Sequence, residues 1–386
     1  MSSRNSPLRR FLLSFVFAIT FLTPLLGNET PHSVPPEGVA PFDPKPLMAK
    51  VEERVQTDKY RFAVLGDVKH ATTFPPLVQF MDEEYRPDFV FTTGDMVRSG
   101  GGRSGADYWQ RFAKDSGGVL RERPWWPVVG NHELAGTPAH IIWHEDDPDA
   151  DEPPPELDGV SNFKHFYGLE QQYYAVNFRN AVFLALPFPM PKGESEKWLK
   201  DELKKASAAG KHIFVINHVP FFTIGQKSKS QVPNKETKFT ELFSEYHVRA
   251  VFSGHDHSYY RTIRNGVPYV ISAGGGATIY PGLRLSEALQ DDVYYCAAPP
   301  AKKAKDTKGG AADKTVPAKD PKDQVAAKMP PAKGKYICHN GATGWADKVS
   351  DKVDQFVVIV DVDGPKVTML CVTAKGEKFD EMVLAR

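Results

Sequence analysis

The chain has 386 residues and a formal net charge of zero, because 48 basic side chains balance 48 acidic ones. A neutral chain has no global field that attracts nucleic acid or a charged membrane surface, so neither partner is expected. The hydrophobic fraction of 41% is sufficient for one sizeable core.

The first predicted element is an N-terminal targeting segment. Arg4, Arg9 and Arg10 precede the apolar run Phe11–Gly27. This run is short for a membrane-spanning helix, which needs about 20 apolar residues. We therefore expect residues 1–27 to be a signal peptide of a secreted or periplasmic protein, with an uncleaved N-terminal anchor as the alternative and no stable membrane span.

A proline-rich leader is predicted next, at residues 28–57. Six prolines between residues 28 and 50 favour an extended chain. From residue 58 onward, short apolar runs alternate with helical stretches, so the folded domain is expected over residues 58–386.

Five short apolar runs each end in a cluster of polar residues. Runs of this kind are typical of buried strands in a parallel or mixed sheet, which delivers the polar groups to one edge. In chain order, the runs and the clusters after them are Phe62–Leu65 with Gly66-Asp67, Phe89–Phe91 with Gly94-Asp95, Trp126–Val129 with Gly130-Asn131-His132-Glu133, Ile213–Ile216 with Asn217-His218-Val219-Pro220, and Ala250–Phe252 with Gly254-His255-Asp256-His257.

A helix and a hairpin are also predicted. Glu194–Ala209 carries an apolar face at helical spacing and is followed by Gly210, which is typical of a helix end. The segments Gln355–Val362 and Lys366–Val372 flank Asp363-Gly364 and are predicted to form a hairpin.

The polar clusters contain carboxylates, an amide and imidazoles. Oxygen and nitrogen donors of this kind suit borderline divalent or trivalent metals. Taken singly, each residue has a simpler role: Asp67 or Asp95 caps a helix, His218 sits in a turn, and His255 and His257 share a polar face. Five such clusters, each at a strand end, favour a metal site.

The order and content of these clusters resemble the calcineurin-like metallophosphoesterase superfamily, over about residues 58–280. The segments His257-Ser258-Tyr259-Tyr260-Arg261 and Ser272–Ala277 resemble its purple acid phosphatase branch. The resemblance implies an α/β (α+β) fold: a four-layer sandwich with two mixed β-sheets packed face to face and helices outside.

The resemblance also implies a set of site residues. Asp95 would bridge two metal ions, drawn from iron, zinc or manganese, and is a catalytic residue together with His132, which would face the leaving group without binding metal. The substrate phosphate would contact Asn131 and His132. Asp67 and His257 would complete the first metal site, and Asn131, His218 and His255 the second.

Two positions depart from the family pattern. Lys69 stands where the superfamily often has a histidine ligand, and Arg98 stands where purple acid phosphatases have a tyrosine ligand. A protonated lysine or arginine has no lone pair for a metal, so the first site is expected to be weak. Either the two cations point to solvent, or at least one contacts the substrate phosphate; His70 is a possible substitute ligand after a one-residue shift.

Two insertions interrupt the pattern. Glu145–Asp158 holds eight acidic residues, and Pro299–Lys335 holds ten lysines against four aspartates. The second insertion has too little apolar surface to order itself. Cys296 and Cys338 flank it and are predicted to form a disulfide in an oxidising compartment, which would leave Cys371 as a buried free thiol.

The predicted function is a metal-dependent phosphoesterase that hydrolyses small phosphate monoesters with a metal-bridging hydroxide. Two alternatives stay open: a phosphodiesterase of the same fold, and a catalytically degenerate phosphate-binding module. His132 argues against the second alternative, because a module that only binds does not need an acid facing the leaving group.

Overall fold

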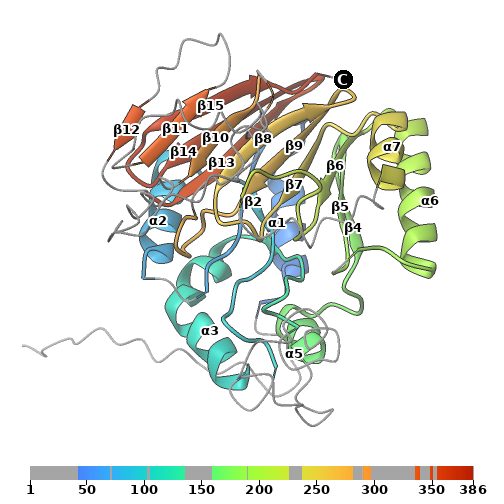
Figure 1. Ribbon diagram of the computed structural model, residues 1–386. Coiled ribbons are helices and arrows are strands. Elements are labelled where there is room, and N and C mark those ends of the chain that lie inside the picture. Colours follow the sequence, from blue (N-terminus) through green and yellow to red (C-terminus); the bar gives the residue numbers. More distant parts are fainter. Residues whose placement is uncertain are drawn as a thin grey trace, which may run out of the picture. The chain divides into compact units, whose positions relative to one another are not determined.

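The computed structural model describes residues 42–69, 72–101, 105–134, 159–188, 190–225, 237–280, 289, 291–296, 335–339, 348–350 and 354–385 (Figure 1). The predicted signal peptide, the acidic insertion and residues 299–334 of the lysine-rich insertion lie outside these ranges. Within the described residues, no helix is long and apolar enough to cross a membrane.

The first sheet has six strands in the order β15-β14-β13-β1-β2-β3. β1, β2 and β3 run parallel, whereas β13, β14 and β15 are joined to β1 by antiparallel pairing. The strands are β1 (Lys59–Leu65), β2 (Phe89–Thr92), β3 (Trp125–Trp126), β13 (Phe356–Asp363), β14 (Lys366–Thr373) and β15 (Lys378–Val383).

The second sheet has nine strands in the order β12-β11-β10-β8-β9-β7-β6-β5-β4. β5, β6, β7 and β9 run parallel, and the remaining neighbours are antiparallel, so both sheets are mixed. The strands are β4 (Tyr174–Phe178), β5 (Ala181–Ala185), β6 (His212–Ile216), β7 (Ala250–Ser253), β8 (Tyr259–Arg264), β9 (Val267–Ser272), β10 (Val293–Cys296), β11 (Lys335–His339) and β12 (Lys348–Ser350).

The two sheets pack face to face through an aromatic core. Phe62 of β1 lies with its ring centroid 4.9 Å from that of Phe183 in β5 and 5.1 Å from that of Phe214 in β6. Neighbouring residues of β1 alternate between layers: Phe62 belongs to this central core, while Ala63 and Leu65 pack on the opposite face against helices. Because both faces of this part of β1 are buried, the run Phe62–Leu65 is apolar throughout.

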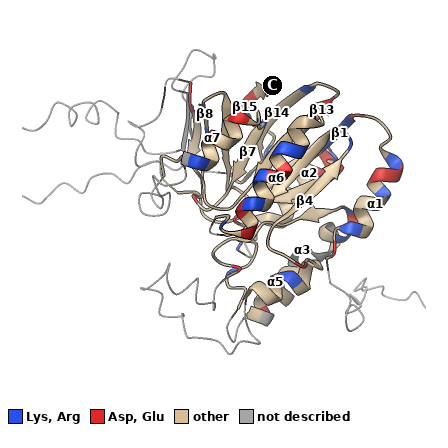
Figure 2. Cartoon of the chain, turned by 90° about the vertical axis from the view of Figure 1, so that its right-hand side faces the viewer, with Lys and Arg blue, Asp and Glu red and all other residues tan. Residues whose placement is uncertain are grey.

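Helices cover both outer faces and complete the predicted four-layer sandwich (Figure 1). α2 (Phe74–Glu84), α3 (Gly105–Glu122) and α5 (Gly159–Tyr167) pack on the first sheet, and α6 (Glu194–Ala208) and α7 (Thr237–Glu245) pack on the second. The predicted helix at Glu194–Ala209 is confirmed as α6, which buries Leu199 and Leu203 and carries charges of both signs outward (Figure 2).

The leader prediction is wrong for part of its length. Lys45–Arg54 forms helix α1, and its Met48 and Val51 belong to the core between the sheets. Pro46 lies in the first turn of α1, where its missing N–H has no partner to lose. The prolines therefore mark a helix start here rather than an extended chain.

The C-terminal hairpin is confirmed, with β13 and β14 joined by a turn at Gly364 and Pro365. Gly364 has a φ of +57°, which glycine adopts without strain. A further strand, β15, follows at the edge of the sheet and was not predicted. Cys371 is buried in β14 as a free thiol, as expected.

The ends of the lysine-rich insertion meet as two antiparallel strands. β10 pairs with β11 so that Tyr294 lies opposite Cys338 and Cys296 lies opposite Tyr336. The two cysteines are therefore diagonal neighbours, and strand pairing closes the base of the insertion. The Cys338 side chain lies outside the described part of the structure, so the disulfide stays a prediction.

Candidate metal centre

All five predicted polar clusters lie at the carboxyl ends of strands. Those after β1, β2 and β3 come from the first sheet, and those after β6 and β7 come from the second. Hydrogen bonds join the loops across the sandwich: the N–H of His255 donates to Asp67 Oδ2 (3.0 Å), and the N–H of Gly275 donates to Gly66 O (2.8 Å). The two sheet edges thus form one site.

The first group of potential ligands comprises Asp67, Asp95 and His257, all buried, with donor atoms within 4.8 Å of one another. Nε2 of His257 lies 3.3 Å from Oδ1 of Asp67. Asp67 and Asp95 have φ values of +60° and +56°. Non-glycine residues rarely adopt this strained conformation, which clusters at functional sites and here turns both carboxylates toward one point.

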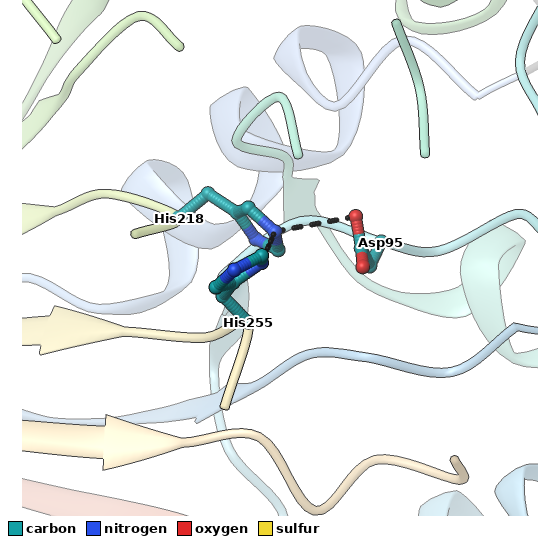
Figure 3. Close-up of side chains that lie close together, drawn as sticks. All are labelled: Asp95, His218 and His255. Carbon is teal, nitrogen blue, oxygen red and sulfur yellow. Dashed lines mark hydrogen bonds and ion pairs between the residues drawn. The ribbon is translucent and has the colours of Figure 1, made fainter. Parts of the chain in front are cut away.

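The second group comprises Asp95, His218 and His255 (Figure 3), and the amide of Asn131 joins them. Oδ1 of Asn131 lies 2.9 Å from Nε2 of His218 and 3.0 Å from Nδ1 of His255. The two rings approach to 3.2 Å between Nδ1 of His255 and Nε2 of His218, and Oδ1 of Asp95 lies 3.3 Å from that same Nε2. Four donor atoms therefore converge.

Asp95 takes part in both groups through different oxygens. Its Oδ1 faces His218 of the second group and also accepts the backbone N–H of His132 (3.0 Å). Its Oδ2 faces Lys69 Nζ at 3.1 Å, on the side of the first group. Burial by itself would raise the pKa of Asp95, but the neighbouring His218, His132 and Lys69 hold that pKa well below its usual value.

Backbone carbonyls fix which ring nitrogens carry protons. Nδ1 of His218 lies 2.7 Å from Thr93 O, and Nδ1 of His257 lies 2.9 Å from Thr278 O. A carbonyl oxygen only accepts, so each Nδ1 is the donor, and each Nε2 is the ring nitrogen that can present a lone pair to a cation. In the second group this lone pair faces the Asn131 and Asp95 oxygens, which are also acceptors. A bound cation would relieve this convergence of lone pairs, so the second group fits a metal ion.

Two glycines allow the ligands to approach so closely. Gly94 has a φ of +91°, and a Cβ there would lie 2.8 Å from His218 Nδ1 and from Gly130 N. A Cβ on Gly254 would lie 2.6 Å from Oδ2 of Asp67. Either side chain would displace a ligand, which explains the glycine before Asp95 and the glycine before His255.

Glu133 shapes the site without joining either group, and the sequence reasoning missed it. Its buried carboxylate accepts the backbone N–H groups of Gly130 (2.7 Å), Asp95 (2.8 Å), Met96 (2.7 Å) and Val97 (3.3 Å). It therefore clamps the loop after β2 to the loop after β3. Burial, and next the charge of Asp95, raise the pKa of Glu133 to about 7. Its place beside His132 was the only available signal.

Tyr280 was also missed, because it lies 23 residues beyond the last cluster and belongs to no motif. Its ring stacks on that of His257, with centroids 4.2 Å apart and planes 9° apart. Its N–H donates to His257 O at 2.6 Å. Together with Thr278, Tyr280 holds the His257 ring in the plane that points Nε2 toward Asp67.

The two departures from the family pattern have different positions. Lys69 is nearly buried, and its Nζ lies 3.1 Å from both Asp95 Oδ2 and His257 Nε2, inside the first group. Burial disfavours its charge, but Asp95 and Asp67 outweigh this and raise its pKa. Arg98 has an exposed side chain and contributes its backbone carbonyl, which accepts from Nδ1 of His132. His70 lies outside the described residues.

His132 lies at the edge of the two groups. Its side chain is 24% exposed, and its Nε2 is 3.8 Å from Oδ2 of Asp95. The structure thus brings together the seven residues predicted as ligands or catalytic groups, together with Lys69. Among the predicted site side chains that the structure describes, it leaves Arg98 outside. 

The family model for calcineurin-like phosphoesterases matches residues 60–259, which is more than half of the chain. The chain belongs to the calcineurin-like phosphoesterase family. The matched residues run from β1 to the start of β8 and include every member of both ligand groups.

Individual relatives are more distant. Tartrate-resistant acid phosphatase type 5 from Mus musculus is 27% identical over 224 residues, which cover 51% of this chain and 63% of that protein. Serine/threonine-protein phosphatase CPPED1 from Danio rerio is 25% identical, over 54% of this chain and 68% of its own. The crystal structure of a dimetal phosphatase from Danio rerio is 11% identical, with a TM-score of 0.45 over 84% of this chain and 98% of that chain. This member of the family therefore spans less than two thirds of the mouse relative that it matches.

Proposed function

We propose that this chain hydrolyses small phosphate monoesters at a metal centre built on Asp95, Asn131, His218 and His255. The observation that carries the proposal is the convergence of four lone-pair donors with the His218 tautomer set by Thr93. The donors are oxygen and nitrogen atoms, so iron, zinc and manganese are the metals proposed.

A metal ion at this position would supply Lewis acidity, lowering the pKa of water and drawing phosphate oxygens toward itself. Asp95 gives the site a negative charge, whereas Asn131 adds a donor atom without further charge that would repel phosphate. The backbone N–H groups of His132 and His255 orient the carboxylates of Asp95 and Asp67.

His132 is proposed as the general acid for the leaving group. Its Nδ1 donates to Arg98 O, which orients the ring and leaves Nε2 at the partly exposed edge of the site. The carboxylate of Asp95 lies 3.8 Å from that Nε2. A protonated Nε2 then donates its proton to the ester oxygen as the bond to phosphorus breaks.

The named relatives support a monoester over a diester. The mouse protein is named an acid phosphatase, the Danio rerio protein a serine/threonine-protein phosphatase, and a third relative, from Allium cepa, a phosphoenolpyruvate phosphatase. All three names describe removal of a terminal phosphate.

The test is turnover of p-nitrophenyl phosphate and of bis(p-nitrophenyl) phosphate by the full chain, before and after chelation. We expect faster turnover of the monoester, loss after chelation, and recovery with added metal. Asp95→Ala should lose metal and activity together, because Asp95 takes part in both groups. His165→Ala, on the exposed side of α5, is the matched control and should retain both.

Two outcomes would replace the proposal. Preference for the diester would indicate a phosphodiesterase of the same fold. Binding of inorganic phosphate without turnover of either ester would indicate a phosphate-binding module. Unchanged metal content and activity in Asp95→Ala would contradict the assignment of the site itself.

Export is proposed as well, from the charge and length of residues 1–27. N-terminal sequencing of the protein recovered from its host should give a chain that begins after this segment. A chain that retains residue 1 and sediments with membranes would instead indicate an uncleaved anchor.

A further inference from the structure

The first group of potential ligands surrounds a side chain of the protein itself. Nζ of Lys69 lies 3.1 Å from Asp95 Oδ2 and 3.1 Å from His257 Nε2, and the lysine side chain is only 15% exposed. Asp67 is the third member of this group, with Oδ1 3.3 Å from His257 Nε2. The ammonium therefore lies among the atoms that a first metal ion would have to bind.

The lone pair of His257 is already used. Its Nδ1–H donates to Thr278 O at 2.9 Å, so Nε2 is the acceptor for Lys69 Nζ–H. The contact with Asp95 Oδ2 is an ion pair without hydrogen-bond geometry. Metal bonds to these atoms are about 2.0–2.2 Å long, so a metal ion would take the space beside or at Nζ. The repulsion between that metal and the ammonium would expel one of the two cations.

The position of Lys69 is imposed by its backbone. Lys69 has a φ of +49°, in the left-handed region that side chains rarely adopt. The N–H groups of Val68 and Lys69 both donate to Asp95 O, at 2.9 and 3.3 Å. These bonds fold the loop after β1 back over the loop after β2, and so direct Lys69 toward the carboxylates. A rare conformation that is held by two backbone hydrogen bonds is a built feature of the loop.

The two groups are therefore unequal. The first has two carboxylates, Asp67 and Asp95, with an ammonium that offsets their charge, as buried charges require. In the second, the nearest contacts that the structure gives for His218 Nε2 are Asn131 Oδ1, His255 Nδ1 and Asp95 Oδ1, and each of these atoms can donate a lone pair to a metal ion. A metal ion fits the second group and does not fit the first while Lys69 remains there.

We propose that the ammonium of Lys69 takes the place of the first metal ion, so that this chain binds one metal per molecule, at the second group. The inference rests on the proposed function only for the metal at that second group. In the proposed reaction, the ammonium of Lys69 would bind a phosphate oxygen through its positive charge and its remaining N–H bonds. It would act as a point charge at the position where the family has a Lewis-acidic metal ion.

The test compares manganese content in matched variants of the full chain. Wild type, Lys69→His and Lys59→His are loaded with Mn²⁺, desalted and measured by elemental analysis. We expect about one Mn per chain in wild type and about one more in Lys69→His, because histidine removes the ammonium and supplies a ligand. Lys59→His is the control for the same substitution at an exposed position of β1, and should match wild type.

Electron paramagnetic resonance gives a second readout that is independent of activity. An isolated Mn²⁺ is expected in wild type, and a spin-coupled pair in Lys69→His. If Lys69→His does not fold, Lys69→Ala also removes the ammonium and keeps Asp67, Asp95 and His257, so Mn²⁺ titration should show one added, weaker binding event. Two Mn per chain in wild type, or no added metal in a folded variant, would overturn the inference. Absence of phosphatase activity would count against the proposed function only. The inference about Lys69 would still be decided by the change in metal content between wild type and variant.

Discussion

Replacing Arg261 by methionine is expected to lower the free energy of unfolding by about 3–5 kcal/mol, because it leaves a buried carboxylate without its counter-ion. Arg261 of β8 donates from Nε (2.6 Å) and Nη2 (3.0 Å) to Asp380 of β15, and the hydroxyl of Tyr259 donates to the same carboxylate. All three side chains are buried. The pair joins one sheet to the other, and Arg261 lies four residues after the site residue His257.

A matched pair on the surface controls for the chemistry. Arg61 contacts Asp361 through the same two-pronged geometry, at 2.6 and 3.0 Å, but these side chains are 34% and 46% exposed. Water already solvates both groups, so Arg61→Met is expected to cost about 0–1 kcal/mol. The difference between the two substitutions isolates the effect of burial.

The assay is urea unfolding with comparison of midpoints at constant slope. The double variant Arg261→Met/Asp380→Leu removes both charges and should regain most of the lost stability. The recovery is incomplete because the hydroxyl of Tyr259 loses its hydrogen-bond acceptor. An Arg261→Met cost no larger than that of Arg61→Met would refute the reasoning. The reasoning would also be refuted if the stability losses of the two single variants, at Arg261 and at Asp380, added up to the loss of the double variant, because partners in a buried pair must couple.

Three further predictions concern the site and the insertion. Glu133 has a pKa of about 7 in the fold, raised from 4.5, so its contribution to stability is complete below pH 4.5 and is lost as pH rises through 7. Between these two pH values, the free energy of unfolding of chelated wild type should fall by about 3 kcal/mol relative to that of Glu133→Gln. If both proteins show the same dependence of stability on pH, the raised pKa is contradicted. His132→Ala should keep metal and lose about 10²–10⁴-fold in rate, most for esters with poor leaving groups, whereas an equal loss for good and poor leaving groups would exclude the acid role. Deletion of residues 299–334 should leave metal content and p-nitrophenyl phosphate turnover nearly unchanged, since the pairing of β10 with β11 holds the two ends of the insertion together. A folded deletion variant without turnover would show that the insertion builds part of the site.

Much of the sandwich could be predicted because its signals are local. A run such as Phe62–Leu65 is apolar throughout, which is what a strand buried on both faces requires, and the next residue is a glycine that permits a tight turn into Asp67. The same pattern recurs before Asp95 and His255. The helix α6 has an apolar face with helical spacing and was predicted almost to the residue.

Other elements had no local signal. Pro44 and Pro46 are equally consistent with an extended leader and with the first turn of a helix, and only the burial of Met48 and Val51 against the sheets decides between the two. β15 has mixed polarity because it is an edge strand, so its sequence lacks the continuous apolar run of the central strands.

By itself, the sequence determined which donor atoms the site contains and their order along the chain, because each follows a strand whose apolar pattern is visible locally. Only the tertiary structure decided how those atoms are used. Glu133 is a neighbour of His132 in sequence, but its role as acceptor for backbone N–H groups on two loops exists only once β2 and β3 lie side by side. Whether Lys69 faced solvent or the carboxylates was open in the sequence, because its direction depends on the backbone conformation imposed by hydrogen bonds to Asp95, 26 residues away.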